Sequence, residues 1–132
     1  MDPTPAPGAG RATQGLDRLD IQAAILLHLE WCVQFNEHLS GGIGRHHGLS
    51  PLPDARHCDF GRWLTTAADR APGRHPRYAE LVQSHERFHT LAEEALRLAR
   101  EDRMDLASTL LNTAFERERT LILAILRDMQ RG

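Results

Sequence analysis

The stretch that decides the fold runs from residue 78 to residue 96 and reads YAELVQSHERFHTLAEEAL. Its apolar residues recur at steps of three and four, which is the period of one face of an α-helix. His85 and His89 are in phase with this apolar face and four residues apart, so both imidazoles leave the helix on the same side. We therefore expect a helix that carries two histidines toward a core.

The same periodicity predicts three further helices. We expect the first over residues 17–40, a shorter second over residues 53–67, and the fourth over residues 105–129, while the helix around His85 should end between residues 100 and 103. Residues 41–53 are rich in Gly and Pro and are predicted to be a long loop. With no strand pattern visible, the predicted fold class is all-α: an antiparallel four-helix bundle in which helix two is the shortest.

Length and composition favour one small domain. The 132 residues suffice for a single core. Residues 1–15 are dominated by Pro, Ala, Gly and Thr and are predicted to be a disordered N-terminal tail, which leaves residues 16–132 as the single helical domain.

Charge and cysteine content exclude several classes of partner. The 16 Lys plus Arg do not exceed the 18 Asp plus Glu, so we expect neither nucleic acid nor a membrane surface as a partner. Two cysteines are too few for a disulfide framework, and the chain lacks the start of a secretory signal, so the expected localisation is cytoplasmic. The longest apolar runs are far shorter than the roughly 20 residues that span a bilayer.

The fourth helix carries two parallel sets of apolar residues rather than one. Together with Leu27 and Trp31 on the first helix, this suggests more apolar surface than one small bundle covers, and we expect a homodimer. The alternative is that the second set packs internally against the short second helix.

Two inward imidazoles require partners, because burying an unpartnered polar group costs on the order of 1 to 3 kcal/mol. His28 is in phase with the apolar face of the first helix, and Cys58 is expected to face inward within the first turn or two of the second. Each alone is most simply a core histidine or an inert thiol. Together, three imidazoles and a thiol form a sensible tetrahedral set for Zn2+.

Two alternatives use some of the same residues. His85-Glu86-Arg87-Phe88-His89 also matches the H-E-x-x-H pattern of zinc proteases, in which Glu86 would be the general base. We disfavour this interpretation, and expect no enzymatic activity, because His28 and Cys58 would close the coordination shell and Glu86 is off the ligand face. Cys32 shares a face with His28 and could replace Cys58 as a ligand, although a small buried hydrophobe is its simpler role.

Three motifs resemble one family. His28-x-x-Trp31, Cys58-x-Phe60-Gly61-x-Trp63 and His85-x-x-Phe88-His89, at intervals of 30, 27 and 4 residues between the four candidate ligands, are similar to the chemoreceptor zinc-binding (CZB) domain over residues 17–130. The resemblance implies a four-helix bundle, often homodimeric, that holds one zinc ion. It implies the metal ligands His28, Cys58, His85 and His89, supported by Trp31, Gly61, Trp63 and Phe88.

The resemblance also implies a role in signalling. Domains of this family usually belong to chemoreceptors or diguanylate cyclases and sense zinc, or oxidants that attack the zinc-bound cysteine. We expect no such signalling module after Gly132, so a stand-alone domain would signal to a separate partner protein. A helix N-terminus beside Cys58 should favour its thiolate, and loss of zinc should release helix two. The alternative is a structural-zinc interaction or scaffold domain without a sensing role.

Overall fold

The computed structural model describes the backbone of residues 5–40 and 52–131 and the side chains of residues 18–40 and 52–131. Its helical elements follow in the order α1 (Pro5–Ser40), α2 (Asp59–Ala67), the 3-10 helix η1 (Ala71–Arg74), α3 (Tyr78–Arg100), α4 (Met104–Leu110), the π-helix η2 (Leu111–Phe115) and α5 (Glu116–Arg131). These ranges contain no strand, and the predicted all-α bundle is confirmed.

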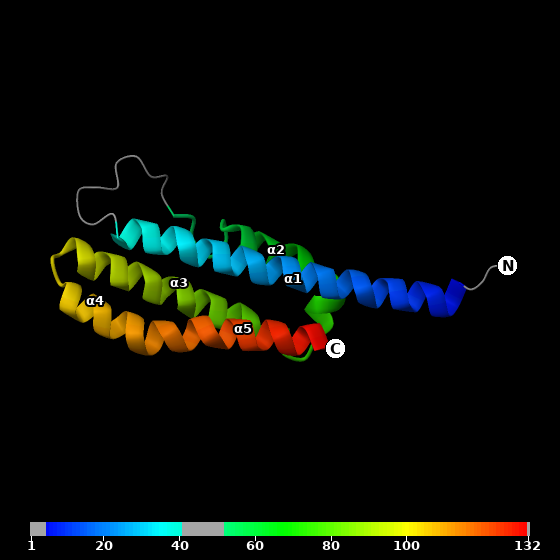
Figure 1. Ribbon diagram of the computed structural model, residues 1–132. Coiled ribbons are helices and arrows are strands. Elements are labelled where there is room, and N and C mark those ends of the chain that lie inside the picture. The colour runs from blue at the N-terminus through cyan, green and yellow to red at the C-terminus, as the bar shows by residue number, and fades with distance from the viewer. Residues whose placement is uncertain (1–4, 41–51, 132) are drawn as a thin grey trace.

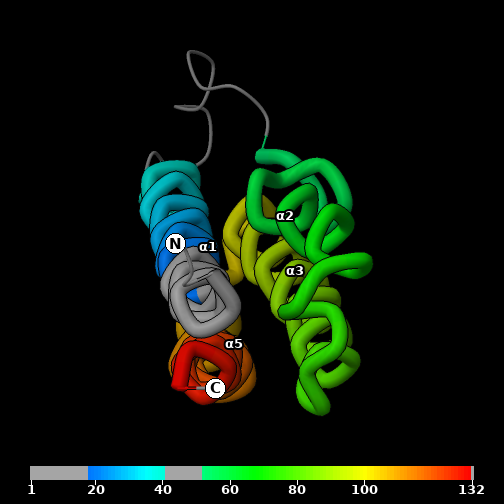
Figure 2. Tube along the Cα trace, turned by 90° about the vertical axis from the view of Figure 1, so that its right-hand side faces the viewer, coloured from blue at the N-terminus to red at the C-terminus, as the bar shows by residue number. Residues whose placement is uncertain are grey.

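The bundle consists of four helical segments, here called arms, of which three are long and one, α2, is short. Because α4, η2 and α5 follow one another without a break, they form a single arm beside α1 and α3, and each successive helix runs opposite to the one before (Figure 1). Viewed end-on, α1 and α5 lie on one side and α2 and α3 on the other (Figure 2). The core lies between them and contains side chains from every arm.

Side-chain hydrogen bonds fasten the short arm to its neighbours. Trp63 Nε1 of α2 donates to Asp20 Oδ1 of α1 at 2.9 Å, and Arg70 forms an ion pair with the same carboxylate. The Tyr78 hydroxyl at the start of α3 donates to the Leu64 carbonyl at 2.6 Å. The position of α2 against α1 and the start of α3 is therefore set by polar contacts as well as by apolar packing.

Helix ends differ from the predictions in two places. The backbone of α1 is helical from Pro5, well before the predicted start at residue 17. The α2 helix begins at Asp59 instead of residue 53, because Asp54 caps a separate turn: its Oδ1 accepts the N–H groups of Arg56 and His57 at 3.1 and 3.0 Å. Residues 41–51 of the predicted loop lie outside the described residues, and the domain boundaries stay a prediction.

The apolar residues that we assigned to a spare surface are not the ones exposed. Trp31 is only 6% exposed and Leu27 packs against the core, so this part of the prediction was wrong. The exposed apolar side chains of α1 are instead Leu19, Leu26, Leu29 and Val33. Among the described residues, none of the helices is both long and apolar enough to span a membrane.

Candidate metal site

Cys58 is the N-cap of α2. Its backbone is extended, with φ −70° and ψ 157°, and its sulfur accepts the backbone N–H of Gly61 at 3.2 Å. The prediction had placed Cys58 inside the first turn or two. Because the turn formed by Asp54 delays the start of the helix, the cysteine instead takes the position whose side chain satisfies the free N–H groups of the first turn.

Gly61 allows the chain to fold this tightly. A Cβ atom on Gly61 would lie 1.9 Å from the carbonyl oxygen of Ala55, in the turn that precedes α2. The close approach predicted for this glycine is therefore made to the preceding turn. Any larger residue would push this turn, and Cys58 with it, away from α2.

Three predicted ligands meet in the core. The Cys58 sulfur lies 3.4 Å from His85 Nε2 and 3.5 Å from His89 Nε2, and the ligand atoms of this group are all within 4.8 Å of one another. The three residues are 1%, 3% and 4% exposed, respectively. The four-residue spacing on α3 turns both imidazoles toward the sulfur, as helical geometry requires. This group has the donors and the size to hold a metal ion.

His28 lies beside the group without belonging to it. The residue is 1% exposed, and its ring centroid lies 5.0 Å from that of Phe88 and 5.9 Å from that of Phe60. Its Nε2 is buried with no hydrogen-bond partner among the described residues. Since the ring also bonds to the backbone of Arg119, Nδ1 must make that contact, which leaves Nε2 as a free lone pair. A buried nitrogen without a hydrogen-bond partner is rare in folded proteins, and coordination to a metal ion would account for this one.

The three histidines are held neutral. Burial lowers the pKa of His85 from 6.5 to about 3, with further lowering by the neighbouring His89 and His28. Burial also lowers the pKa of His28 and of His89 to about 4. Neutral imidazole is the form that binds metal, so no proton has to leave these rings at neutral pH.

Burial and the start of α2 act in opposite directions on the pKa of the Cys58 thiol. Burial raises its pKa, and this effect outweighs the backbone N–H groups of Gly61 and Phe60, which act in the opposite direction. The start of α2 thus favours the thiolate, as predicted, but not enough to overcome desolvation. The thiolate needs a further positive charge beside it, which a bound cation would provide.

Aromatic rings enclose the group. The Trp31 ring lies 4.4 Å from that of His89, and the Phe60 ring lies 4.9 Å from that of His85, measured between centroids. Trp63 is one layer farther out, stacked on Phe60 with 5.8 Å between centroids. These rings exclude water and lower the local dielectric, which strengthens any electrostatic interaction at the sulfur.

Two residues named in the alternatives take no part in the group. Glu86 is exposed on α3, directed away from the ligand face. Cys32 is half-buried on α1, where burial raises the pKa of its thiol to about 11.

Sequence reasoning missed two supporting contacts. One is the Arg119 carbonyl at Nδ1 of His28, which no side-chain pattern could have indicated because a backbone atom makes it. The other joins α3 to α5: the buried Ser84 hydroxyl, next to His85, donates to Glu118 Oε1 at 2.6 Å, and Arg87 Nε donates to Glu118 Oε2 at 3.1 Å. The in-phase position of Ser84 on the apolar face was the signal available for this second contact.

Comparison with models of protein families gives a match to the chemoreceptor zinc-binding domain over residues 28–96, more than half of the chain. The matched segment includes all four predicted ligands. The searches of curated proteins and of solved structures returned no match.

Proposed function

Because the chain belongs to the chemoreceptor zinc-binding domain family, we propose that it binds one zinc ion and uses the state of that site to regulate a separate protein. The proposed ligands are Cys58, His85 and His89, with His28 as the fourth. One observation carries this proposal: the buried Nε2 of His28 has no hydrogen-bond partner, and its ring lies beside the converging donor atoms of the other three residues.

The donor set fits zinc in particular. One thiol and three neutral imidazoles suit this borderline-soft ion, whereas the hard ions Mg2+ and Ca2+ require oxygen ligands. When bound, zinc would supply the positive charge that keeps Cys58 as a thiolate. The ring of His28 is already oriented for this role, because Nδ1 is occupied by the Arg119 carbonyl and Nε2 is left for a metal.

The positions of the ligands in the fold support a sensing role. Cys58 caps α2, His85 and His89 are on α3, and His28 is on α1, so one site links three arms of the bundle. Oxidation of the Cys58 thiolate by hypochlorous acid would give a sulfenic acid and chloride, and it would remove a ligand and alter the cap of α2 in one step. The site then connects zinc or oxidant to the position of the short arm.

The test uses the zinc-loaded protein and stoichiometric hypochlorous acid. Release of zinc, followed with a chromogenic chelator, should accompany a change in helicity measured by circular dichroism. If neither changes, the oxidant-sensing role is overturned.

A structural-zinc interaction or scaffold domain is the second candidate, favoured by the nearly complete burial of the group. Zinc removal separates the two roles. A sensor should give a folded, altered metal-free protein that binds zinc again, whereas a structural site should release zinc only on unfolding.

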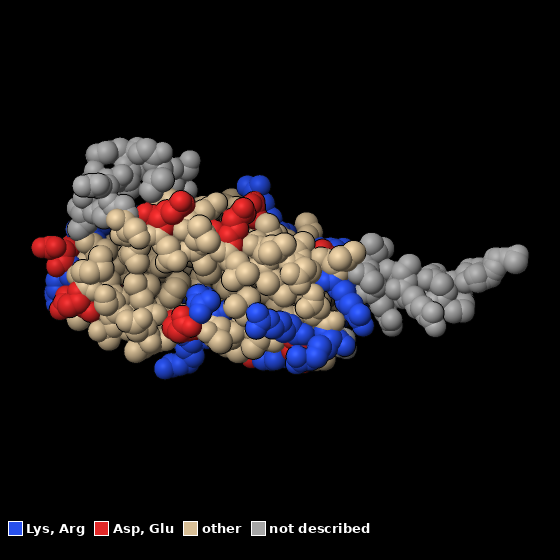
Figure 3. All heavy atoms as spheres, viewed as in Figure 1, with Lys and Arg blue, Asp and Glu red and all other residues tan. Residues whose placement is uncertain are grey.

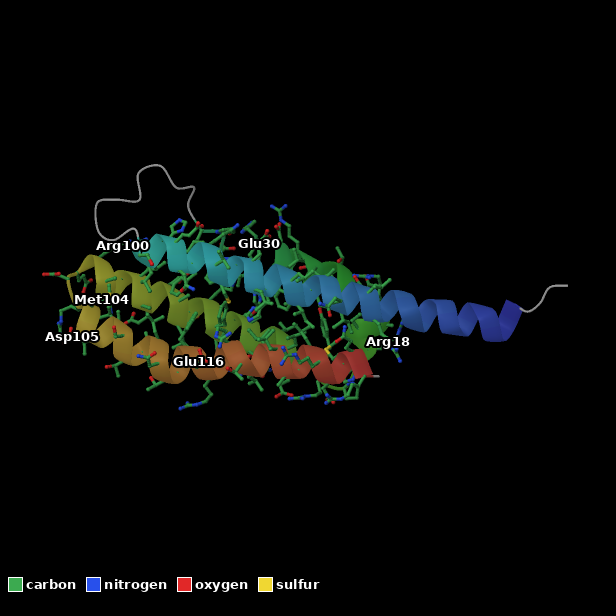
Figure 4. The ribbon with its side chains drawn as sticks, in the orientation of Figure 1. Arg18, Glu30, Arg100, Met104, Asp105 and Glu116 are labelled. Carbon is green, nitrogen blue, oxygen red and sulfur yellow. The ribbon has the colours of Figure 1, made fainter. Side chains whose placement is uncertain are left out.

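We also propose that a second copy of the chain pairs along α1. Leu19, Leu26 and Val33 are exposed and seven residues apart, which is the spacing of a coiled-coil seam. An uncharged band crosses the surface over α1, with acidic side chains along its upper edge (Figure 3). Arg18 and Glu30 are well separated along this helix (Figure 4). A second copy packed on Leu19, Leu26 and Val33 would remove their exposed apolar area from water.

The partner that receives the signal is proposed to be a separate protein. The two free cysteines suit the reducing cytoplasm, which we propose as the location of both.

A further inference from the structure

We infer that a pocket between the 54–57 turn, α2 and α3 is the passage through which zinc and small thiol reagents reach Cys58. This inference rests on the proposed zinc site for its purpose. The pocket itself, and access through it to the sulfur, can be tested without metal.

The pocket has a volume of about 350 Å³ and reaches the metal group at one point. His85 is the member of that group in its wall, which also includes Ala55 and Gly61. All three contact the sulfur of Cys58: His85 Nε2 lies at 3.4 Å, the Gly61 N–H donates to it at 3.2 Å, and the Ala55 carbonyl lies at 3.8 Å. Three residues that line the pocket are thus in direct contact with the sulfur.

Aromatic rings lie against the histidines on other sides of the group. Trp31 covers His89, and Phe60 and Phe88 cover His28. A second surface pocket, lined among others by Gln83, Glu86 and Glu118, has none of the four candidate ligands in its wall. Of these two pockets, the one beside His85 is the one with a candidate ligand in its wall.

The size and lining of the pocket suit a small polar ligand or reagent. Its volume equals that of about twelve water molecules in the liquid, enough for a metal ion that still carries several waters or for a small alkylating reagent. The exposed side chains of Arg56 and Glu86 contribute one positive and one negative charge to its lining, so neither cations nor anions are strongly repelled.

Two adjacent threonines of α2 provide a matched pair of variants. Thr65 lines the pocket and Thr66 does not, yet both are exposed and both donate to a backbone carbonyl within the helix, at 3.1 and 3.0 Å. A tryptophan at position 65 should fill the pocket, whereas a tryptophan at position 66 adds the same bulk outside it. Thr65→Trp and Thr66→Trp are made in a Cys32→Ser background so that Cys58 is the sole thiol.

The first measurement is the alkylation of the metal-free protein by iodoacetamide, followed by mass spectrometry. In this reaction the thiolate displaces iodide and forms a thioether. We expect Thr65→Trp to slow the reaction severalfold relative to Thr66→Trp, with equal circular dichroism spectra for the two. Equal rates would overturn the passage, because the sulfur would then be reached by another route such as local unfolding.

The second measurement is the rate of zinc uptake by the same variants. Thr65→Trp should take up zinc severalfold more slowly and reach the same final stoichiometry. If neither variant binds zinc through Cys58, the proposed function fails while the alkylation result still decides the passage. If both bind zinc at equal rates, the passage fails and the zinc site stands.

Discussion

The Cys58 sulfur lies 3.4 Å from Nε2 of His85 and at the same time caps the helix that leads away from it, through the Gly61 N–H. The Cys58 sulfur therefore has two roles, one as a candidate metal ligand and one as the cap of α2. Any chemistry at this sulfur acts on both. Substitutions at Cys58 and at the residues around it can separate these two roles.

Cys58→Ser should remove the metal ligand and keep the cap, because serine is among the strongest N-cap residues. We expect α2 to persist and zinc affinity to fall by more than about 100-fold, beyond the usual effect of removing an outer-shell partner. Competition titration with a chromogenic chelator measures the affinity. Cys32→Ser is the control and should bind zinc as the native chain does; an unchanged affinity in Cys58→Ser would refute its assignment.

Gly61→Ala should destabilise the domain even though alanine is the better helix former by about 1 kcal/mol. The added Cβ would lie 1.9 Å from the Ala55 carbonyl oxygen, so the preceding turn must move. We expect the free energy of unfolding in urea to fall by about 1 to 3 kcal/mol. The exposed Thr66→Ala on the same helix should change it by no more than about 0.5 kcal/mol; a neutral Gly61→Ala would contradict the close approach.

Acid should destabilise the metal-free protein at an unusually mild pH. Burial lowers the pKa of His28, His85 and His89 from 6.5 to about 4, 3 and 4, respectively, so between these values the unfolded chain binds protons that the folded chain does not. The stability from these histidines is complete above pH 6.5 and is lost as pH falls. The free energy of unfolding should fall by about 1.4 kcal/mol per pH unit for each histidine, and by about 4 kcal/mol per pH unit for the three together.

Urea unfolding of the metal-free protein between pH 7.5 and 5 measures this slope. His85→Gln removes one of the three groups and should flatten the slope by about one third. A stability that does not change with pH in this range would show that these rings titrate normally.

Pairing along α1 should be sensitive to one charge in the exposed seam. Leu26→Glu places a carboxylate at the centre of the stripe formed by Leu19, Leu26 and Val33, and should give a monomer in analytical ultracentrifugation. Leu106→Glu is the matched control, since this exposed leucine lies on α4, away from the stripe. A native chain that is already monomeric at high concentration, or an unchanged dimer in Leu26→Glu, would contradict pairing through this face.

Sequence periodicity predicted the arms of the bundle well because long amphipathic helices leave a strong signal. It also predicted two apolar sets on the last arm. Both sets contribute to one buried face of α5, which contains Ile122 and Leu126 from one set and Ile125 and Met129 from the other. In this helix, what suggested spare surface is therefore packed inside the bundle.

The candidate site was predictable to a different degree. Convergence of Cys58, His85 and His89 could be predicted because helical phase directs the two imidazoles, and the chemistry of the donors selects the thiol. The cap position of Cys58 could not, since it depends on Asp54 closing a turn of its own before the helix starts. Neither could the orientation of His28, which depends on a main-chain oxygen of a distant helix.

The Nε2 atom of His28, which lacks a hydrogen-bond partner, affects the stability of the whole domain. A buried nitrogen left without a partner lowers the stability of the metal-free fold by about 1 to 3 kcal/mol, and an ion that bonds to it restores that amount as affinity. The domain is thus less stable when empty, and the gain in affinity lowers the zinc concentration at which its melting temperature begins to rise. The unpartnered nitrogen of the metal-free protein thus helps to set the range of zinc concentrations over which the domain is stabilised.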